Sequence, residues 1–169
     1  EGSRDLGYAD LPAEYDAGLD DLNEAETVTL RDPGCTVFPE FRLPAIATTH
    51  FVISVPCLKA HSFATITGSL KNMMGFAPPA YCQQGGHWKK SAFHERMHEA
   101  LIDLARYRTP DLSVMDARVG LSEFHLGGPE CDPPVRKILA DFDARELDRT
   151  AAGLLGFDWT TIGHLADAA

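Results

Sequence analysis

The sequence predicts an α/β fold with a mainly parallel sheet and helices on both of its faces. Three short apolar runs have the length and composition of buried strands, at residues 51–55, 112–115 and 137–140. Helical patterns or long connections separate them, as parallel neighbours require. With 169 residues, 44% of them hydrophobic, the chain is expected to form a single α/β domain over residues 1–169.

The first half of the chain supplies the elements that lead to the central strand. A short helix is expected from Pro12 to Gly18, followed by an acidic connector. Residues 27–30 and 36–38 can pair as a hairpin, because the Pro-Gly sequence between them favours a tight turn. One or two helical turns are expected from Leu43 to Thr48. The chain starts without Met and ends in what reads as the middle of a helix, so we expect a fragment of a larger α/β domain, truncated at both ends.

The central strand leads directly into polar and basic residues. Pro56 is expected to end this strand, since proline cannot donate a hydrogen bond to a ladder. Lys59 and His61 would then lie at the carboxyl edge of the sheet, where α/β proteins bind ligands. Both are candidate catalytic residues that would act as hydrogen-bond donors.

A short helix should follow and carry Lys71 and Asn72, which are candidate ligand-binding or cofactor-binding residues. Ser69 can cap this helix and Gly75 can end it. A continuous helix from His61 would carry Lys71 about 15 Å away, whereas a break at Gly68 lets the two basic groups converge. We expect the break.

Residues 76–91 have two prolines, two glycines and no periodicity, which is typical either of a binding loop or of a mobile surface loop. As a lid, this loop would bring His87, Lys89 and Lys90 over the site.

The pattern of apolar residues predicts a continuous helix from Ala92 to Tyr107, capped by Ser91. Within it, His94-Glu95-Arg96-Met97-His98 matches His-Glu-x-x-His, which places two imidazoles one turn apart, as a zinc protease requires. The match is short, and no Gly-x-x-His extension follows it. A zinc-dependent hydrolase is therefore a minor alternative.

Carboxylates follow the other two predicted strands. Asp116 is expected just after the strand at 112–115, and is a candidate metal ligand or general base. Asp143 and Glu146 form a capping box for a helix from Ala144 to Leu155, and Asp143 joins the candidate ligand-binding residues. A right-handed parallel crossover would bring Asp116 beside Lys59 and His61, as one site.

The net charge and the spacing of the cysteines limit which partners and cofactors are expected. A formal charge of −10 argues against nucleic acid and anionic membranes. No acid occurs between Glu40 and Glu95, a stretch with four lysines, which indicates either a central anion-binding pocket or simply a buried strand and loop.

No run of 18 apolar residues occurs, so no transmembrane segment is expected. The four cysteines lack any Cys-x-x-Cys, so no iron–sulfur cluster is expected in this segment, and Cys57 is expected to be a buried free thiol.

Four motifs carry a resemblance to a known family: Pro-x-Leu-Lys-x-His from Pro56, Leu-Lys-Asn-x-x-Gly from Leu70, PDLSVMDA from Pro110 and LLGFD from Leu154. Over residues 5–167 the chain resembles the prokaryotic family catalogued as domain of unknown function 362. Many of its members carry ferredoxin-type clusters or a twin-arginine type leader, so the resemblance implies a fold and a site, with a redox or cofactor-related role as one expectation. Asp143 and Asp148 match acids of a family turn whose proline is missing here.

Two functions therefore stay open, a small-molecule enzyme or cofactor-handling protein and a non-catalytic binding or accessory domain. The expected ligand is a small anionic or metal-bound molecule. The cysteine pattern favours a cytoplasmic location, while an exported form stays open because a leader would precede this sequence. The sequence names no reaction, cofactor or oligomeric state.

Overall fold

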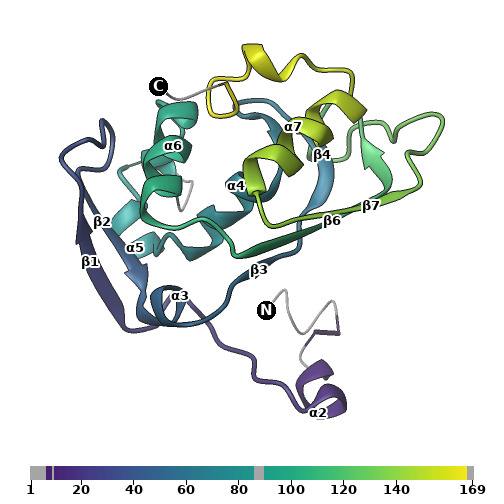
Figure 1. Ribbon diagram of the computed structural model, residues 1–169. Helices are drawn as coiled ribbons and strands as arrows, with labels where there is room; N and C mark the ends of the chain where they lie inside the picture. Colours follow the sequence, from purple (N-terminus) through teal and green to yellow (C-terminus); the bar gives the residue numbers. More distant parts are fainter. Residues whose placement is uncertain (1–6, 9, 86–89, 167–169) are drawn as a thin grey trace.

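The computed structural model describes residues 7, 8, 10–85 and 90–166 (Figure 1). Its helices and strands are α2 Leu11–Tyr15, β1 Thr27–Arg31, β2 Glu40–Pro44, α3 Ala45–Thr49, β3 Ile53–Ser54, β4 Cys57–His61, β5 Thr65–Thr67, α4 Ser69–Asn72, η1 Met73–Phe76, α5 Pro79–Cys82, η2 Ser91–Phe93, α6 Met97–Tyr107, β6 Leu112–Leu121, β7 Lys137–Asp141, α7 Ala144–Leu154 and η3 Trp159–Thr161.

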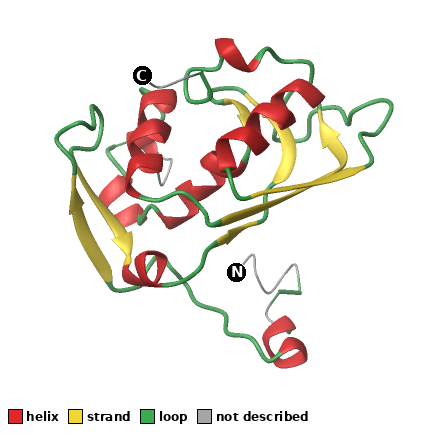
Figure 2. Cartoon of the chain, viewed as in Figure 1, coloured by secondary structure: helices red, strands yellow, loops and turns green. Residues whose placement is uncertain are grey.

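The main sheet confirms the α/β class. Its long strand β6 pairs in parallel with β3 and β4 and antiparallel with β7, and β5 pairs antiparallel with β4. A separate antiparallel ribbon of β1 and β2 lies beside α6 (Figure 2). One core fills the space between this ribbon and α6, and a second lies between the main sheet and α7.

The strand predicted at residues 51–55 differs from the prediction in two ways. As β3 it ends at Ser54, before Pro56 as expected, but pairing with β6 does not stop there, because the Pro56 carbonyl accepts a hydrogen bond from the Asp116 amide at 2.9 Å and β4 begins at Cys57 along the same partner strand. Nor is it buried on both faces, since Phe51, Ile53 and Val55 are 65%, 54% and 64% exposed. At Pro56 the hydrogen bond to β6 is made by the proline carbonyl, so the missing N–H of proline leaves no hydrogen bond unmade there.

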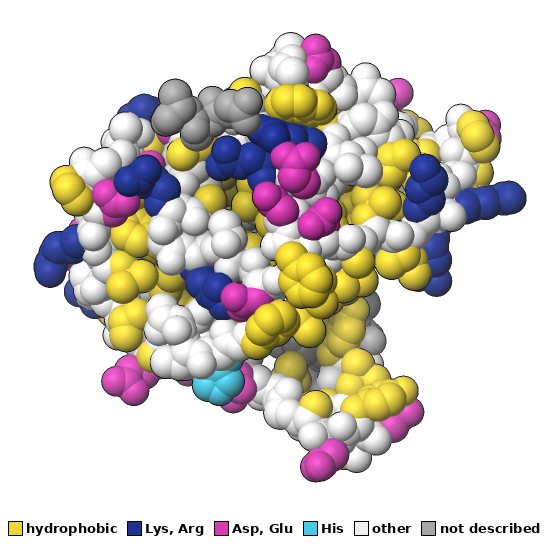
Figure 3. Space-filling view, viewed as in Figure 1, with side chains coloured by type: hydrophobic (Ala, Val, Ile, Leu, Met, Phe, Trp, Pro, Cys, Tyr) yellow, Lys and Arg dark blue, Asp and Glu magenta, His cyan; other side chains and the backbone are white. Residues whose placement is uncertain are grey.

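Burial alternates along this strand, as it does in a strand with one face toward solvent. We predicted helices on both faces; in the described chain α4 and α7 lie against one face, and the other carries exposed apolar side chains that include Ile53 and Ile138. Figure 3 shows apolar side chains at the surface in the region of β3, β6 and β7. Cys57 lies on this face as an exposed thiol, so its predicted burial is wrong.

Strand β6 continues to Leu121, so Asp116 lies within it and not after its end. The predicted strand at 137–140 is confirmed as β7, and the helix after it as α7. Asp143 caps α7, as predicted, by accepting hydrogen bonds from the amides of Arg145 and Glu146 at 2.9 and 3.2 Å.

The predicted helix over residues 92–107 is shorter at its start, because α6 begins only at Met97. Ser91 does not cap it. The Ser91 hydroxyl instead accepts from the Gln84 amide at 2.8 Å and donates to the Gly85 carbonyl at 3.0 Å. A side chain that closes a preceding loop in this way is not available to cap the helix that follows.

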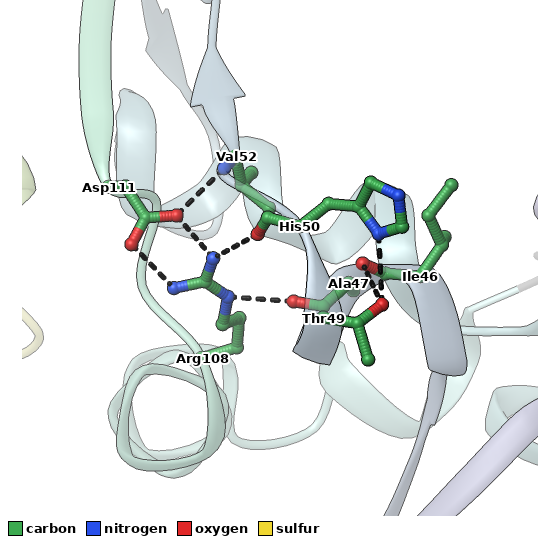
Figure 4. Close-up of polar contacts among 7 residues, drawn as sticks. All are labelled: Ile46, Ala47, Thr49, His50, Val52, Arg108 and Asp111. Atoms are coloured by element: carbon green, nitrogen blue, oxygen red, sulfur yellow. Dashed lines mark hydrogen bonds and ion pairs between the residues drawn. The ribbon is translucent and has the colours of Figure 1, made fainter.

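The entry into β3 is held by Arg108 and Asp111, which follow α6 (Figure 4). The Arg108 guanidinium donates to the carbonyls of Ala47 and His50, at 2.8 and 3.1 Å, and pairs with Asp111. Asp111 also accepts from the Val52 amide at 2.7 Å. One arginine thus ties α3 and the start of β3 to the end of α6, which fixes where β3 begins. His50 takes part in this network through its backbone carbonyl.

Candidate functional site

The end of β4 and the helix after β5 bring the predicted basic residues together. In the β4–β5 hairpin, Lys59 lies opposite Thr67 and His61 lies opposite Thr65. The predicted break at Gly68 is confirmed, because β5 ends at Thr67 and α4 begins at Ser69. α4 therefore folds back beside β5 and α7 (Figure 1). This brings Lys71 close enough to Lys59 and His61 for its charge to interact with theirs.

A buried carboxylate fixes the start of α4. Asp148 of α7 has 0% exposure and accepts hydrogen bonds from the amides of Ser69 and Leu70, at 2.5 and 2.9 Å. A Cβ atom on Gly68 would lie 2.3 Å from the Asp148 carboxyl group, so only glycine fits there without a shift. Burial raises the pKa of Asp148 to about 7, against the opposing effect of the two amides. α4 is thus locked onto α7.

Two further contacts fix the orientation of α4. The Ser69 hydroxyl is hydrogen-bonded to the Ser113 hydroxyl of β6 at 2.5 Å. The Asn72 side-chain amide donates to the Ser54 hydroxyl of β3 at 3.0 Å. Asn72, a predicted ligand-binding residue, therefore uses its amide to hold α4 on the sheet. The contacts at both ends of α4 position Lys71 between them.

His61 is held in one tautomer. Its Nδ1 atom accepts hydrogen bonds from the amides of Phe63 and Ala64, at 3.1 and 3.2 Å. A nitrogen that accepts carries no proton, so the neutral ring carries its proton on Nε2. His61 is 8% exposed, and burial, together with the charge of Lys71, lowers its pKa to about 3. His61 is therefore a neutral N–H donor over the physiological pH range.

The backbone of the hairpin is strained next to this ring. Thr65 has a φ of 65°, which is unusual for a β-branched residue. The two amides that bond to His61 Nδ1 belong to the same turn. The imidazole therefore stabilises the strained turn, and the two amides of the turn hold the ring in one orientation.

Two histidines that sequence reasoning did not select for this site lie close to it. The ring of His125 stacks on that of His61, with centroids 4.0 Å apart, and its Nδ1 is buried with no partner among the described residues. His94 meets the Phe63 ring edge-on at 5.5 Å, and its Nδ1 is 3.1 Å from the Lys90 carbonyl oxygen. His125 lies in the loop between β6 and β7, beside Gly127 and Gly128, and no motif of the sequence marks it for this site.

Lysine side chains gather here without a carboxylate partner among the described residues. Burial, followed by the charges of Lys59 and Lys90, lowers the pKa of Lys71 to about 8. Among the described residues the ion pairs all use arginine, and neither Lys59 nor Lys71 has a carboxylate partner in that part of the molecule. Lys90 donates to the carbonyls of Met74 and Gly75. His87 and Lys89, the other residues of the predicted lid, lie outside the described residues.

Asp116 lies apart from these groups. β4 and β6 are parallel neighbours, as the one-site hypothesis required, but Asp116 lies opposite Cys57, four residues and about 13 Å along the strand before His61. The Arg118 guanidinium binds its carboxylate at 2.7 Å and holds its pKa at about 2. Lys59 and Asp116 do share a surface groove, which is also lined by Cys57, Arg118, Gly120 and Glu130. Lys59 therefore belongs both to the basic cluster and to the lining of this groove.

The Asp143 carboxylate caps α7 by accepting from the amides of Arg145 and Glu146. It lines a different groove, between α6 and α7, with Arg106, Phe142 and Arg145. The structure thus brings together Lys59, His61 and Lys71, uses Asn72 to hold the helix that carries Lys71, and gives Asp116 and Asp143 other partners.

The His-Glu-x-x-His motif does not form one helical face, because His94 precedes α6 and only His98 lies within it. His98 Nδ1 is 2.9 Å from Nδ1 of His164, a buried residue of the C-terminal segment. Among residues 7, 8, 10–85 and 90–166, no group of three or more His, Cys, Asp or Glu side chains could hold a metal ion.

Comparison with known proteins gives a family but no reaction. The chain is 31% identical over 117 residues to the thylakoid-associated protein sll1697 of Synechocystis sp.. This match covers 68% of the chain and 35% of the relative, so the chain spans about a third of the length of this curated protein. No solved structure gives a significant match.

In the described part of the chain, none of the helices combines the length and the apolar character needed to span a membrane. The family model described as "Domain of unknown function (DUF362)" matches residues 2–153. This match and the motifs around Lys59 and Lys71 agree, and the chain belongs to the DUF362 family.

Proposed function

We propose that the chain binds a small anionic molecule through Lys59, His61 and Lys71 at the end of β4. The observation that carries the proposal is the pair of lysines without a carboxylate partner among the described residues, in a protein of net charge −10. Clustered cations disfavour one another, and the charges of Lys59 and Lys90 add to the larger effect of burial in lowering the pKa of Lys71. A bound anion would remove this repulsion.

His61 adds direction to this charge. Its Nε2–H is a donor of fixed orientation, and its low pKa keeps the ring neutral. A carboxylate or phosphate oxygen accepts such a hydrogen bond, while the ammonium groups of Lys59 and Lys71 supply the charge. The combination suits a ligand with at least two oxygen atoms on one anionic group.

In a non-catalytic role these polar groups would only hold loops together. Such a role explains the hydrogen bonds of His61 Nδ1, because both are made to backbone amides of the adjacent turn. It does not account for Lys59 and Lys71, because no hydrogen bond or ion pair within the described chain uses their amines. An enzymatic or cofactor-related use of the site would need these two residues to contact the ligand.

Isothermal titration with oxalate and with inorganic phosphate tests the proposal. Lys71→Gln should weaken binding of the preferred anion about tenfold, which corresponds to about 1.4 kcal/mol. Lys137→Gln is the matched control, because Lys137 is an exposed lysine of β7. Equal affinities for the wild type and both variants would contradict the proposal.

The same titration has a predicted pH dependence. Only the protonated Lys71 attracts an anion, and its pKa is about 8. Affinity should therefore fall as the pH rises above about 8, by at most about tenfold per pH unit. In Lys71→Arg this fall should disappear, because arginine stays charged.

A further inference from the structure

Lys71 has the surroundings of a nucleophilic amine. It is half-buried on a short helix that Asp148, Ser113 and Ser54 hold in place. Its neighbours Lys59 and Lys90 are cations, and no carboxylate pairs with it in the part of the chain that the structure describes. Partial burial and nearby cations are the two means by which proteins make a lysine amine neutral and reactive.

We propose that Lys71 condenses with the carbonyl group of a small 2-oxo acid whose carboxylate lies against Lys59 and the His61 Nε2–H. This inference rests on the proposed anion site and names its ligand class. A simple anion would need only the charge of Lys71, whereas a 2-oxo acid places a carbonyl carbon next to the bound carboxylate, within reach of an adjacent amine.

The chemistry needs no other reactant. The lone pair of the neutral amine attacks the carbonyl carbon, which forms a C–N bond and moves the carbonyl π electrons onto oxygen. The nitrogen loses two protons and the oxygen gains two, so the C–O bond breaks and water leaves as the imine forms. A second N–H of the Lys59 ammonium group can donate to the oxygen as its negative charge develops.

The groups around Lys71 favour its neutral form. The positive charges of Lys59 on β4 and of Lys90, which precedes η2, add to burial in lowering the pKa of Lys71. The charge of Lys71 in turn contributes to the lowered pKa values of His61, His125 and His164. The titratable group of α7 packed against α4 is Asp148, whose carboxyl oxygens bind the amides of Ser69 and Leu70. This negative charge is therefore directed at the backbone of α4.

Reductive trapping tests the proposal on the whole chain. Wild-type protein is incubated at about pH 7.5 with glyoxylate and cyanoborohydride, and modified lysines are located by peptide mass spectrometry. Glyoxylate should leave a carboxymethyl group on Lys71 at least about tenfold faster than on exposed Lys137, since each pKa unit changes the neutral fraction about tenfold. Acetaldehyde, which lacks a carboxylate, should label Lys71 more slowly than glyoxylate does.

Variants and a separate binding measurement distinguish the possible failures. Lys71→Arg should lose the adduct at this position, and Lys137→Gln should leave labelling of Lys71 unchanged. Labelling of Lys71 no faster than of Lys137 would overturn the nucleophilic role, while oxalate titration still reports on the anion site. Equal rates with glyoxylate and acetaldehyde, or preferred labelling of Lys59, would overturn the 2-oxo acid assignment. If Lys71→Arg does not fold, the wild-type peptide map alone decides.

Discussion

Replacing Gly68 by alanine should destabilise the protein by about 3 kcal/mol or more. The new Cβ would lie 2.3 Å from the carboxyl group of Asp148, which is buried and held by two backbone amides. Neither the carboxylate nor the backbone can move without breaking these hydrogen bonds. Chemical denaturation followed by circular dichroism measures the loss.

Gly153→Ala is the matched control for this substitution. Gly153 lies in α7, and no atom is within 4 Å of the position of its added Cβ. Alanine should therefore stabilise the protein there, by up to about 1 kcal/mol, because it is the better helix former. If Gly68→Ala were as well tolerated as Gly153→Ala, the packing of α4 against α7 described above would be wrong.

Asp148→Ala should cost about 3 kcal/mol, because it leaves the amides of Ser69 and Leu70 buried without acceptors. It should also weaken oxalate binding, since α4 would no longer hold Lys71 in place. In the Asp148→Ala background the Gly68→Ala substitution should cost at least about 1 kcal/mol less than in the wild type, since the atoms that it meets are gone. Additive losses would contradict the contact.

The pH dependence of stability provides a second check on Asp148. Burial raises its pKa from 3.8 to about 7, so the folded state holds this proton more tightly than the unfolded chain does. The stability that the group contributes is complete below about pH 3.8 and is lost as the pH rises to about 7. Asp148→Asn cannot titrate here, so the advantage of the wild type over this variant should decrease from about pH 4 to about pH 7. An advantage that grows with pH would show the opposite pKa shift.

The sequence predicted the elements of this fold better than their ends. Periodicity and capping identify α7 and its cap Asp143, because both depend on residues close in sequence. That pairing with β6 resumes after Pro56, as β4, depends on which backbone group of Pro56 faces β6, and no local pattern reports this. Likewise, β6 extends past Asp116 because β4 and β7 are there to pair with it.

The candidate site shows the same division. Lys59, His61 and Lys71 were identified from a strand, a break at Gly68 and a helix that are all local, and the structure brings them together. Asp116 was placed with them from strand topology alone, which gives the order of strands but not their register. The stacking of His125 on His61 depends on the path of a long loop, so only tertiary structure reveals it.

We expect the Lys59–His61–Lys71 cluster to bind an anion through a neutral, fixed His61. Nitrogen NMR of ¹⁵N-histidine-labelled protein, with and without oxalate, tests it most directly. His61 should show a protonated Nε2 and an unprotonated Nδ1 without titrating near pH 6.5, and oxalate should shift its Nε2–H signal while leaving that of exposed His50 unchanged. A His61 that titrates near pH 6.5, or an Nε2–H signal that does not respond to oxalate, would contradict the account.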